Sequence, residues 1–258
     1  MRGVTEVDLA SFFQEQGVDV FSEVSIDTLS DKDKSFVMQF FPGGRFVIVF
    51  GKEVPATVYL MLQKEKTRGM LRIAENLNKT AVRLAACMEA EHIPALPVPL
   101  YIPIRITDGS VQGVVRLKQV AAAGGLGSLG RSTVLLSPKF GPRLMLSGVV
   151  TGQPACKSGK AQTNVQSADG PVCIECGQCI SMCPEKALGP AGCDAFRCRI
   201  VHAWVPSLLV PAVKWMLGRR MFLKCMAPLA PWIARIATIR CSLCVIKCPL
   251  FSGQLVRR

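Results

Sequence analysis

Cysteine spacing constrains this chain more than any other feature of its sequence. The chain has 12 cysteines, and all except Cys87 and Cys156 lie between Cys173 and Cys248. The first run has the spacing Cys-x-x-Cys-x-x-Cys-x-x-x-Cys-Pro and comprises Cys173, Cys176, Cys179 and Cys183, followed by Pro184. Such spacing lets three consecutive thiolates surround one [4Fe-4S] cubane while the fourth serves a second cubane. The sequence therefore predicts a fold that encloses metal clusters.

A second run completes the pattern in part. Cys241, Cys244 and Cys248, followed by Pro249, match the last three positions of the same motif, and Thr238 stands where its first cysteine would be. Interleaving the two runs predicts one cluster bound by Cys173, Cys176, Cys179 and Cys248. The other cluster has Cys183, Cys241 and Cys244, and the candidates for its missing ligand are Cys193, Cys198 and Cys225. The alternatives are a three-iron cluster or a zinc site in place of one cubane, although zinc favours tetrahedral cysteine pairs.

Cysteine usage and charge also bear on compartment and partners. Residues 1–21 lack the basic stretch and apolar run of a secretion signal, so we expect a cytoplasmic protein with reduced thiolates. The formal charge of +13 falls to about +9 with two oxidised clusters. A positive charge favours an acidic electron donor such as a ferredoxin or flavodoxin, an anionic cofactor, or an anionic membrane surface. No aromatic-rich basic module stands out, so we expect no nucleic-acid partner.

Apolar periodicity predicts mixed helices and strands in the first part of the chain. A helix is expected over residues 6–16, with Thr5 as its cap and Gly17 as its end. Further predicted elements are a buried strand (46–50), a long helix that Gly69 interrupts (56–92), an extended edge (93–104), a helix closed by glycines (114–123) and two strands (133–137 and 143–150). Because no βαβ repeat appears, we expect an α+β fold. The predicted division is a domain over 1–156, a polar linker over 157–170 and a cluster domain over 171–258.

Residues 203–239 form an apolar insertion in the predicted cluster domain. Prolines and basic residues interrupt it, and no uncharged stretch reaches the roughly 20 residues that a membrane span needs. Short amphipathic helices are expected here. They either pack over the clusters as core, or form a patch that contacts a corrinoid protein, an enzyme partner or a membrane surface.

A glycine-rich segment precedes the cysteines. It reads Gly124-Gly125-Leu126-Gly127-Ser128-Leu129-Gly130, and a Pro138-Lys139-Phe140-Gly141 step follows it. A helix is expected before these glycines, whereas a dinucleotide-binding turn requires a strand there. With the cysteine order, this segment resembles the cobalamin-dependent epoxyqueuosine reductases and reductive dehalogenases. In those families a single cysteine stands alone after the first run, where Cys198 falls.

The resemblance, which covers residues 120–200 and 241–250, implies a fold and a function. The fold would be a nitroreductase-like α+β domain that holds base-off cobalamin, followed by a ferredoxin-like domain with two [4Fe-4S] clusters, with Cys198 as the eighth ligand. The protein would deliver low-potential electrons to the corrinoid, for reductive chemistry or for reactivation of a corrinoid protein. Close approach of backbone to cofactor is expected at Gly125, Gly127 and Gly130, and hydrogen-bond donors to its phosphate and amide groups at Arg131, Ser132 and Thr133.

The chain also departs from these families. The position of the catalytic aspartate of epoxyqueuosine reductases falls near Val111, and Asp108 is close but out of register. The two tyrosines, Tyr59 and Tyr101, lie in no recognisable motif, so the catalytic residues are unknown at this stage. A pure electron-transfer subunit that docks on a partner enzyme and an FMN-binding reductase are therefore the competing hypotheses.

Overall fold

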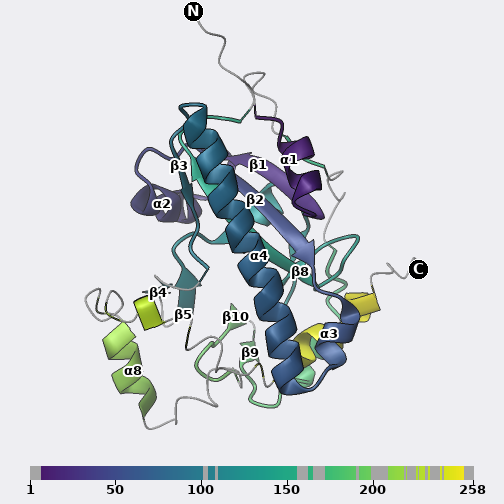
Figure 1. Cartoon of the computed structure of the whole chain (residues 1–258). Coiled ribbons are helices and arrows are strands. Elements are labelled where there is room, and N and C mark those ends of the chain that lie inside the picture. Colours follow the sequence, from purple (N-terminus) through teal and green to yellow (C-terminus); the bar gives the residue numbers. More distant parts are fainter. Residues whose placement is uncertain are drawn as a thin grey trace, which may run out of the picture.

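The computed structural model describes residues 7–100, 104–107, 110–155, 162–164, 172–189, 192–198, 209–217 and 241–252, with isolated residues between 219 and 239. Its centre is a four-stranded antiparallel sheet in the order β1 (Val20–Ser25), β2 (Phe46–Glu53), β8 (Leu144–Thr151) and β3 (Ala95–Pro97). Figure 1 shows the long helix α4 (Gln63–Ala90) lying across one face of this sheet. The described elements confirm a mixed α and β architecture.

Residues 46–50 of strand β2 are all apolar because helices cover both faces of the sheet. Ile48 and Phe50 point to one side and pack with α4 and with α1 (Leu9–Glu15). Val47 and Val49 point to the other side, where they join a core that includes α5 (Leu117–Ala123). Since side chains alternate across a strand, burial of both faces requires a continuous apolar run. The predicted buried strand is thus confirmed.

The long helical pattern breaks at a different place from the one predicted. A short helix α3 (Ala56–Leu60) ends before α4, and Met61 and Leu62 separate the two, while Gly69 lies inside α4. A Cβ at Gly69 would approach the Val58 side chain to 3.0 Å. This glycine therefore serves the close packing of α3 on α4 and does not interrupt the helix.

Two other predicted helix starts were wrong. Helix α1 is capped by Asp8, whose carboxylate accepts hydrogen bonds from the backbone of Ala10 and Ser11, and Thr5 lies outside the described residues. Gly17 has φ +64, which confirms it as the end of this helix. Helix α5 begins only at Leu117, because the hairpin of β4 (Ile104–Thr107) and β5 (Ser110–Gly113) occupies the chain before it.

The elements around the sheet agree only partly with the sequence predictions. The sequence did not reveal β1 or helix α2 (Asp31–Phe40). The predicted extended edge is confirmed for β3, which pairs only with β8 at the border of the sheet. The described part of the predicted linker, residues 162–164, runs along β1, where Gln162 O accepts a hydrogen bond from Glu23 N at 2.9 Å.

The cysteine-bearing segments are built from short elements at one end of α4 (Figure 1). Helices α6 (Gln178–Ser181) and α11 (Leu243–Ile246) follow the starts of the two cysteine runs and pack against each other. The remaining short elements are β6 (Ser128–Leu129), β7 (Leu135–Leu136), β9 (Leu188–Gly189), β10 (Gly192–Cys193), η3 (Ala227–Leu229) and η4 (Pro249–Ser252).

The apolar insertion contains helix α8 (Val210–Leu217), which packs against β4. Ile239, near the end of the insertion, packs against the core around Tyr59 and Met70. Four other large apolar side chains are exposed, namely Leu209, Trp215, Leu229 and Trp232. For these residues the expectation that the insertion forms core over the clusters is wrong. None of the described helices has both the length and the apolar character needed to cross a membrane.

Candidate functional site

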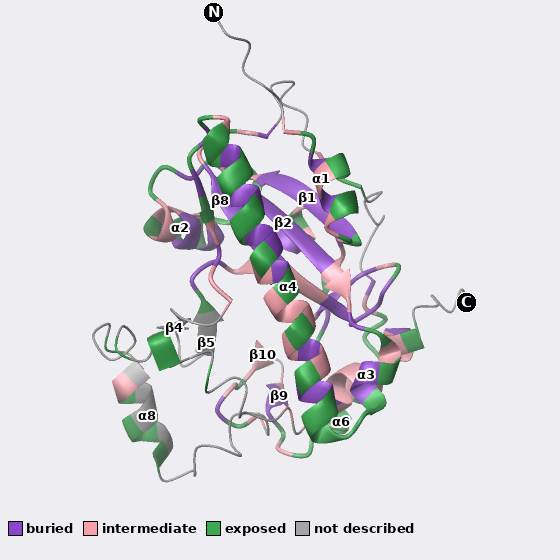
Figure 2. Cartoon of the chain, viewed as in Figure 1, coloured by how far each residue is buried: buried purple, intermediate pink, exposed green. Residues whose placement is uncertain are grey.

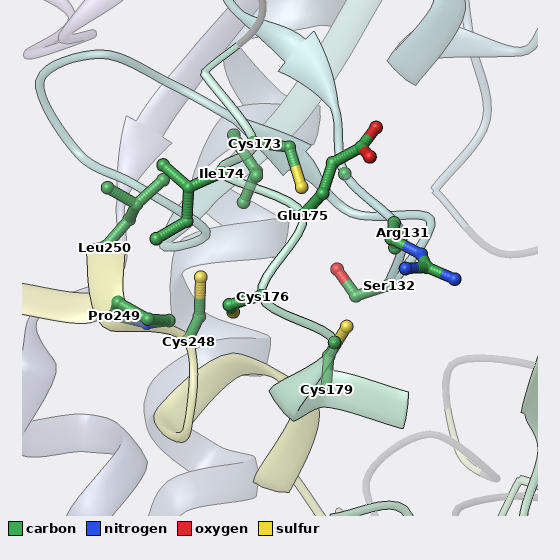
Figure 3. A pocket seen from close by; sticks show the side chains of 13 residues that line it. Arg131, Ser132, Cys173, Ile174, Glu175, Cys176, Cys179, Cys248, Pro249 and Leu250 are labelled. Carbon is green, nitrogen blue, oxygen red and sulfur yellow. The ribbon is translucent and has the colours of Figure 1, made fainter. Parts of the chain in front are cut away.

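Four cysteines from both runs lie around one pocket (Figure 3). We call Cys173, Cys176, Cys179 and Cys248 the first cysteine group; all four line this pocket. Figure 3 shows the sulfurs of Cys173, Cys179 and Cys248 around a shared space, with the Ser132 hydroxyl beside it. Burial raises the pKa of the Cys179 and Cys248 thiols, and the neighbouring thiolates of the group raise it further. The structure thus brings together the set that the interleaved spacing predicts.

The loop of the first run turns through left-handed backbone. Gly177 has φ +71 and Glu175, which is not glycine, has φ +51. A residue with a side chain rarely adopts this conformation, and such residues concentrate at binding sites, where the surrounding fold enforces them. Here the turn lies between Cys173 and Cys179, which line the same pocket together with Cys176.

Close backbone contact holds the second cysteine run beside the Pro138–Gly141 step. Gly141 has φ +56, and a Cβ there would lie 2.0 Å from the carbonyl oxygen of Leu250. The buried Arg143 donates from Nε to the carbonyl of Phe251 at 2.6 Å and forms an ion pair with Glu53. Gly141 and Arg143 therefore fix the chain that directly follows Cys248.

The other cysteines that the sequence predicts as ligands lie near Cys244. We call Cys183, Cys198, Cys241 and Cys244 the second cysteine group. Burial raises the pKa of Cys244 to about 11, and the nearby thiolates of the other three members add to this effect. The backbone N–H of Ala187 points at the Cys183 sulfur, with the nitrogen at 3.3 Å. Hydrogen bonds of this kind are one of the features that set the potential of a cluster.

Cys193 lies next to this second group. Its pKa is raised, first by a side-chain hydrogen bond with Cys198, then by burial and by the thiolates of Cys198 and Cys244. Two of the three candidates for the eighth ligand are therefore adjacent, while the third, Cys225, is exposed. The structure leaves the assignment of Cys198 a prediction, with Cys193 as its nearest competitor.

The donor sets suit cubanes. Within the described part of the chain, no three His, Cys, Asp or Glu side chains converge on a point where they would hold one metal ion. The sulfurs of a tetrahedral zinc site, with Zn–S of about 2.3 Å, lie about 3.8 Å apart. Thiolates of a cubane each bind a different iron and stand farther apart. The first cysteine group, whose four members line one pocket, fits the second geometry.

A much larger pocket separates the sheet from the second cysteine group. Its volume is about 810 Å³, and it is lined by strand β8, the start of α5, β7 and the chain around Cys193, with Val245 of α11. Most of its lining is apolar, and its polar side chains are Tyr59, Arg116, Lys118, Gln119, Thr133 and Cys193. Ligand pockets commonly range from about 300 to 1,000 Å³, so this one accommodates a large cofactor.

The charged and phenolic groups of this large pocket are held in place. Lys118 Nζ donates to the carbonyl of Thr133 at 3.0 Å. The pKa of Lys118 is lowered overall, because the effect of burial exceeds the opposing effect of the Cys193 and Cys244 thiolates. Burial raises the pKa of Tyr59 to about 12, and its ring meets that of Phe251 edge to face at 5.5 Å. Tyr59 is therefore protonated at neutral pH, and the described lining contains no carboxylate.

The residues predicted to bind the cofactor do not share one pocket. Thr133 lines the large pocket, whereas Gly130, Arg131 and Ser132 line the pocket of the first cysteine group. Gly125 and Gly127 line neither of the two; a Cβ on Gly127, at φ +156, would lie 2.1 Å from the Leu136 carbonyl oxygen. The close approach at Gly127 is thus made by another backbone segment, β7.

Sequence reasoning missed several lining residues of the large pocket. Tyr59 had no motif, and Arg116, Lys118 and Gln119 were assigned to an ordinary helix. No local pattern marks them, because this lining is assembled from segments far apart in the chain. Asp108 and Tyr101 lie outside the described residues.

Comparison with known proteins identifies the fold. The epoxyqueuosine reductase from Streptococcus thermophilus matches with a TM-score of 0.59 at 16% identity, over 95% of this chain and 65% of that one. An epoxyqueuosine reductase bound to a modified tRNA-Tyr stem loop matches with a TM-score of 0.57 at 16% identity, over 95% of this chain and 64% of that one. No protein-family model and no curated protein matches the chain. The chain spans 65% of the first of these relatives and has the fold of the epoxyqueuosine reductases.

Proposed function

We propose that the protein binds a [4Fe-4S] cluster in each cysteine group and delivers low-potential electrons to a corrinoid in the large pocket. The observation that carries this proposal is the position of the large pocket, whose wall includes Cys193 and Val245. Val245 directly follows Cys244, a member of the second cysteine group. An electron acceptor in this pocket therefore lies directly beside the second group.

The lining of the large pocket suits a corrinoid. Its apolar wall, formed by β8 and β7, excludes water, while Lys118, Arg116 and Gln119 offer donors to phosphate and amide groups. Arg116 is oriented by an ion pair with Asp33 at 3.0 Å. When bound, a corrinoid supplies reductive chemistry at its cobalt, and the protein supplies orientation and electrostatics. Tyr59 holds its proton at Oη in this pocket and is the candidate donor to a reduced substrate.

The first cysteine group has a separate role in the proposal. It lies nearer the surface than the second group, since Cys176 is exposed. An acidic electron donor, such as a ferredoxin or flavodoxin in the cytoplasm, would reach this group first. Electrons would then pass to the second group and on to the large pocket.

Titration of the reconstituted protein with cob(II)alamin under anaerobic conditions, followed by EPR, tests the proposal. We expect a stoichiometric shift of the cobalt signal to a base-off form. The variant Lys118→Met should weaken corrinoid binding about tenfold or more, because a charged hydrogen-bond donor is lost. Lys139→Met is the matched control, since Lys139 is exposed and lies outside the lining of the large pocket.

Other outcomes identify the competing functions. Stoichiometric binding of FMN without any change at cobalt would show that the large pocket holds a flavin. An unchanged cobalt spectrum with no flavin bound, and reducible clusters, would leave a pure electron-transfer subunit. The electron-transfer alternative is favoured by the described lining, which contains no carboxylic acid that could donate a proton in addition to Tyr59.

A further inference from the structure

The charge of the chain is divided unevenly along its length. All 18 Asp and Glu residues lie at or before Asp194, whereas Lys and Arg continue to Arg258. The last part of the chain is therefore basic without any compensating carboxylate. Within the apolar insertion, its basic residues are Lys214, Arg219, Arg220, Lys224 and Arg235.

The same segment exposes large apolar side chains. Trp215 is 61% exposed and Leu209 is 54% exposed, at and beside helix α8. Further along, Trp232 is 65% exposed and Leu229 is 49% exposed. In Figure 2, α8 lies at the border of the molecule, away from the sheet and its buried strands. Single exposed apolar residues are ordinary, but four of this size in one short segment indicate a surface that binds something.

Tryptophan and arginine lie together on this surface. The guanidinium of Arg219 stacks over the Trp215 ring at 3.8 Å from its centre. Tryptophans and basic side chains occupy the level of the lipid headgroups, where the ring meets the acyl chains and the cation meets phosphate. We propose that residues 203–239 bind the surface of an anionic membrane, with α8 in the plane of the interface.

The composition of the segment favours lipid over an acidic protein. Residues 203–239 contain no Asp, Glu, Asn, Gln or Tyr, and Ser207 and Thr238 are their only hydroxyl side chains. A protein interface carries about one hydrogen bond per 100–200 Å², and this segment has few neutral polar side chains that could form them. A surface of apolar side chains and cations alone matches the acyl chains and phosphates of a lipid monolayer. Helix α8, with 8 residues, is about 12 Å long and fits within the interface.

Tryptophan fluorescence provides a direct test, because all 3 tryptophans, Trp204, Trp215 and Trp232, lie in this segment. The cluster-loaded protein is mixed with vesicles of phosphatidylcholine alone or of phosphatidylcholine with phosphatidylglycerol. With the anionic vesicles we expect a blue shift and quenching by brominated acyl chains. Added salt should weaken binding, because it screens the attraction between exposed charges.

Variants locate the binding surface. Trp215→Glu should reduce the affinity for anionic vesicles about tenfold or more, and Lys214→Gln about fivefold. Val82→Glu is the matched control, since Val82 is 52% exposed on α4, far along the chain from the insertion. It should bind vesicles as the unchanged protein does.

Three results would overturn the proposal. The first is no fluorescence change with anionic vesicles at low salt. The second is vesicle binding that Trp215→Glu leaves unaltered, which would place the contact elsewhere. The third is a fluorescence change with an acidic ferredoxin or flavodoxin and none with vesicles, which would make the segment a protein-docking surface.

Discussion

Replacing Gly141 by alanine tests whether the step from Pro138 to Gly141 positions the second cysteine run. Gly141 has φ +56, and a Cβ at this position would lie 2.0 Å from the Leu250 carbonyl oxygen. Ordinary contact begins at 3.4 Å, so the two backbone segments must separate by more than about 1 Å. Leu250 is bonded to Pro249, which follows Cys248. The separation therefore displaces Cys248 from the first cysteine group.

The energetic effect has two parts. Alanine in left-handed backbone costs roughly 1–2 kcal/mol. Forcing an additional carbon into a well-packed region costs typically about 1–3 kcal/mol more. We therefore expect Gly141→Ala to lower the free energy of unfolding by about 2–5 kcal/mol.

Iron content and chemical denaturation together measure the outcome. After anaerobic reconstitution, Gly141→Ala should retain about half of the iron, because the second cysteine group does not contact Gly141. Its denaturation midpoint should fall. Gly189→Ala is the control, since no atom lies within 4 Å of a Cβ at Gly189 and its φ is not in the left-handed region. Full iron content and an unchanged midpoint in Gly141→Ala would refute the argument that this backbone contact positions Cys248.

Three further predictions follow from other contacts. Cys198→Ala should lose about half of the iron while Cys193→Ala keeps all of it; the opposite result would make Cys193 the eighth ligand. Arg143→Met should destabilise the protein by about 2–3 kcal/mol in urea denaturation and reduce the iron bound by the first cysteine group, because Glu53 and a backbone carbonyl lose a charged donor; an unaltered urea midpoint would contradict this. Burial raises the pKa of Glu23 above 4.5, so its contribution to stability is present below that pH and is lost as pH rises through the raised pKa. Glu23→Gln should therefore stabilise the protein at pH 7 but not at pH 4 in urea denaturation, and equal effects at both pH values would exclude a raised pKa.

Local features of the fold could be predicted from sequence because their causes are local. The Cys-x-x-Cys spacings predict which sulfurs share a loop, since only a few residues separate them. The apolar run of β2 predicts a strand buried on both faces, which helices α4 and α5 confirm. Gly17 ends α1 because the chain needs left-handed backbone directly after the last helical turn.

Glycines show where sequence reasoning reached its limit. A glycine indicates that something approaches the backbone closely, but the sequence does not say what. Gly127 meets the backbone of Leu136, Gly141 meets that of Leu250, and Gly69 admits the side chain of Val58. The prediction of cofactor contact at Gly127 and of a helix break at Gly69 failed to anticipate these neighbours, which are brought there by other parts of the chain.

The sequence by itself predicted that Cys173, Cys176 and Cys179 face one pocket, because the spacing of ligands along a loop is a property of the loop. The large pocket was decided by tertiary structure alone. Its wall combines Tyr59 after β2, Lys118 at the start of α5, and Cys193 of the cluster region. None of these residues has a local motif, and their chemistry depends on burial and on neighbours contributed by distant segments. Periodicity and spacing report on neighbours along the chain, whereas a pocket is formed by neighbours in space.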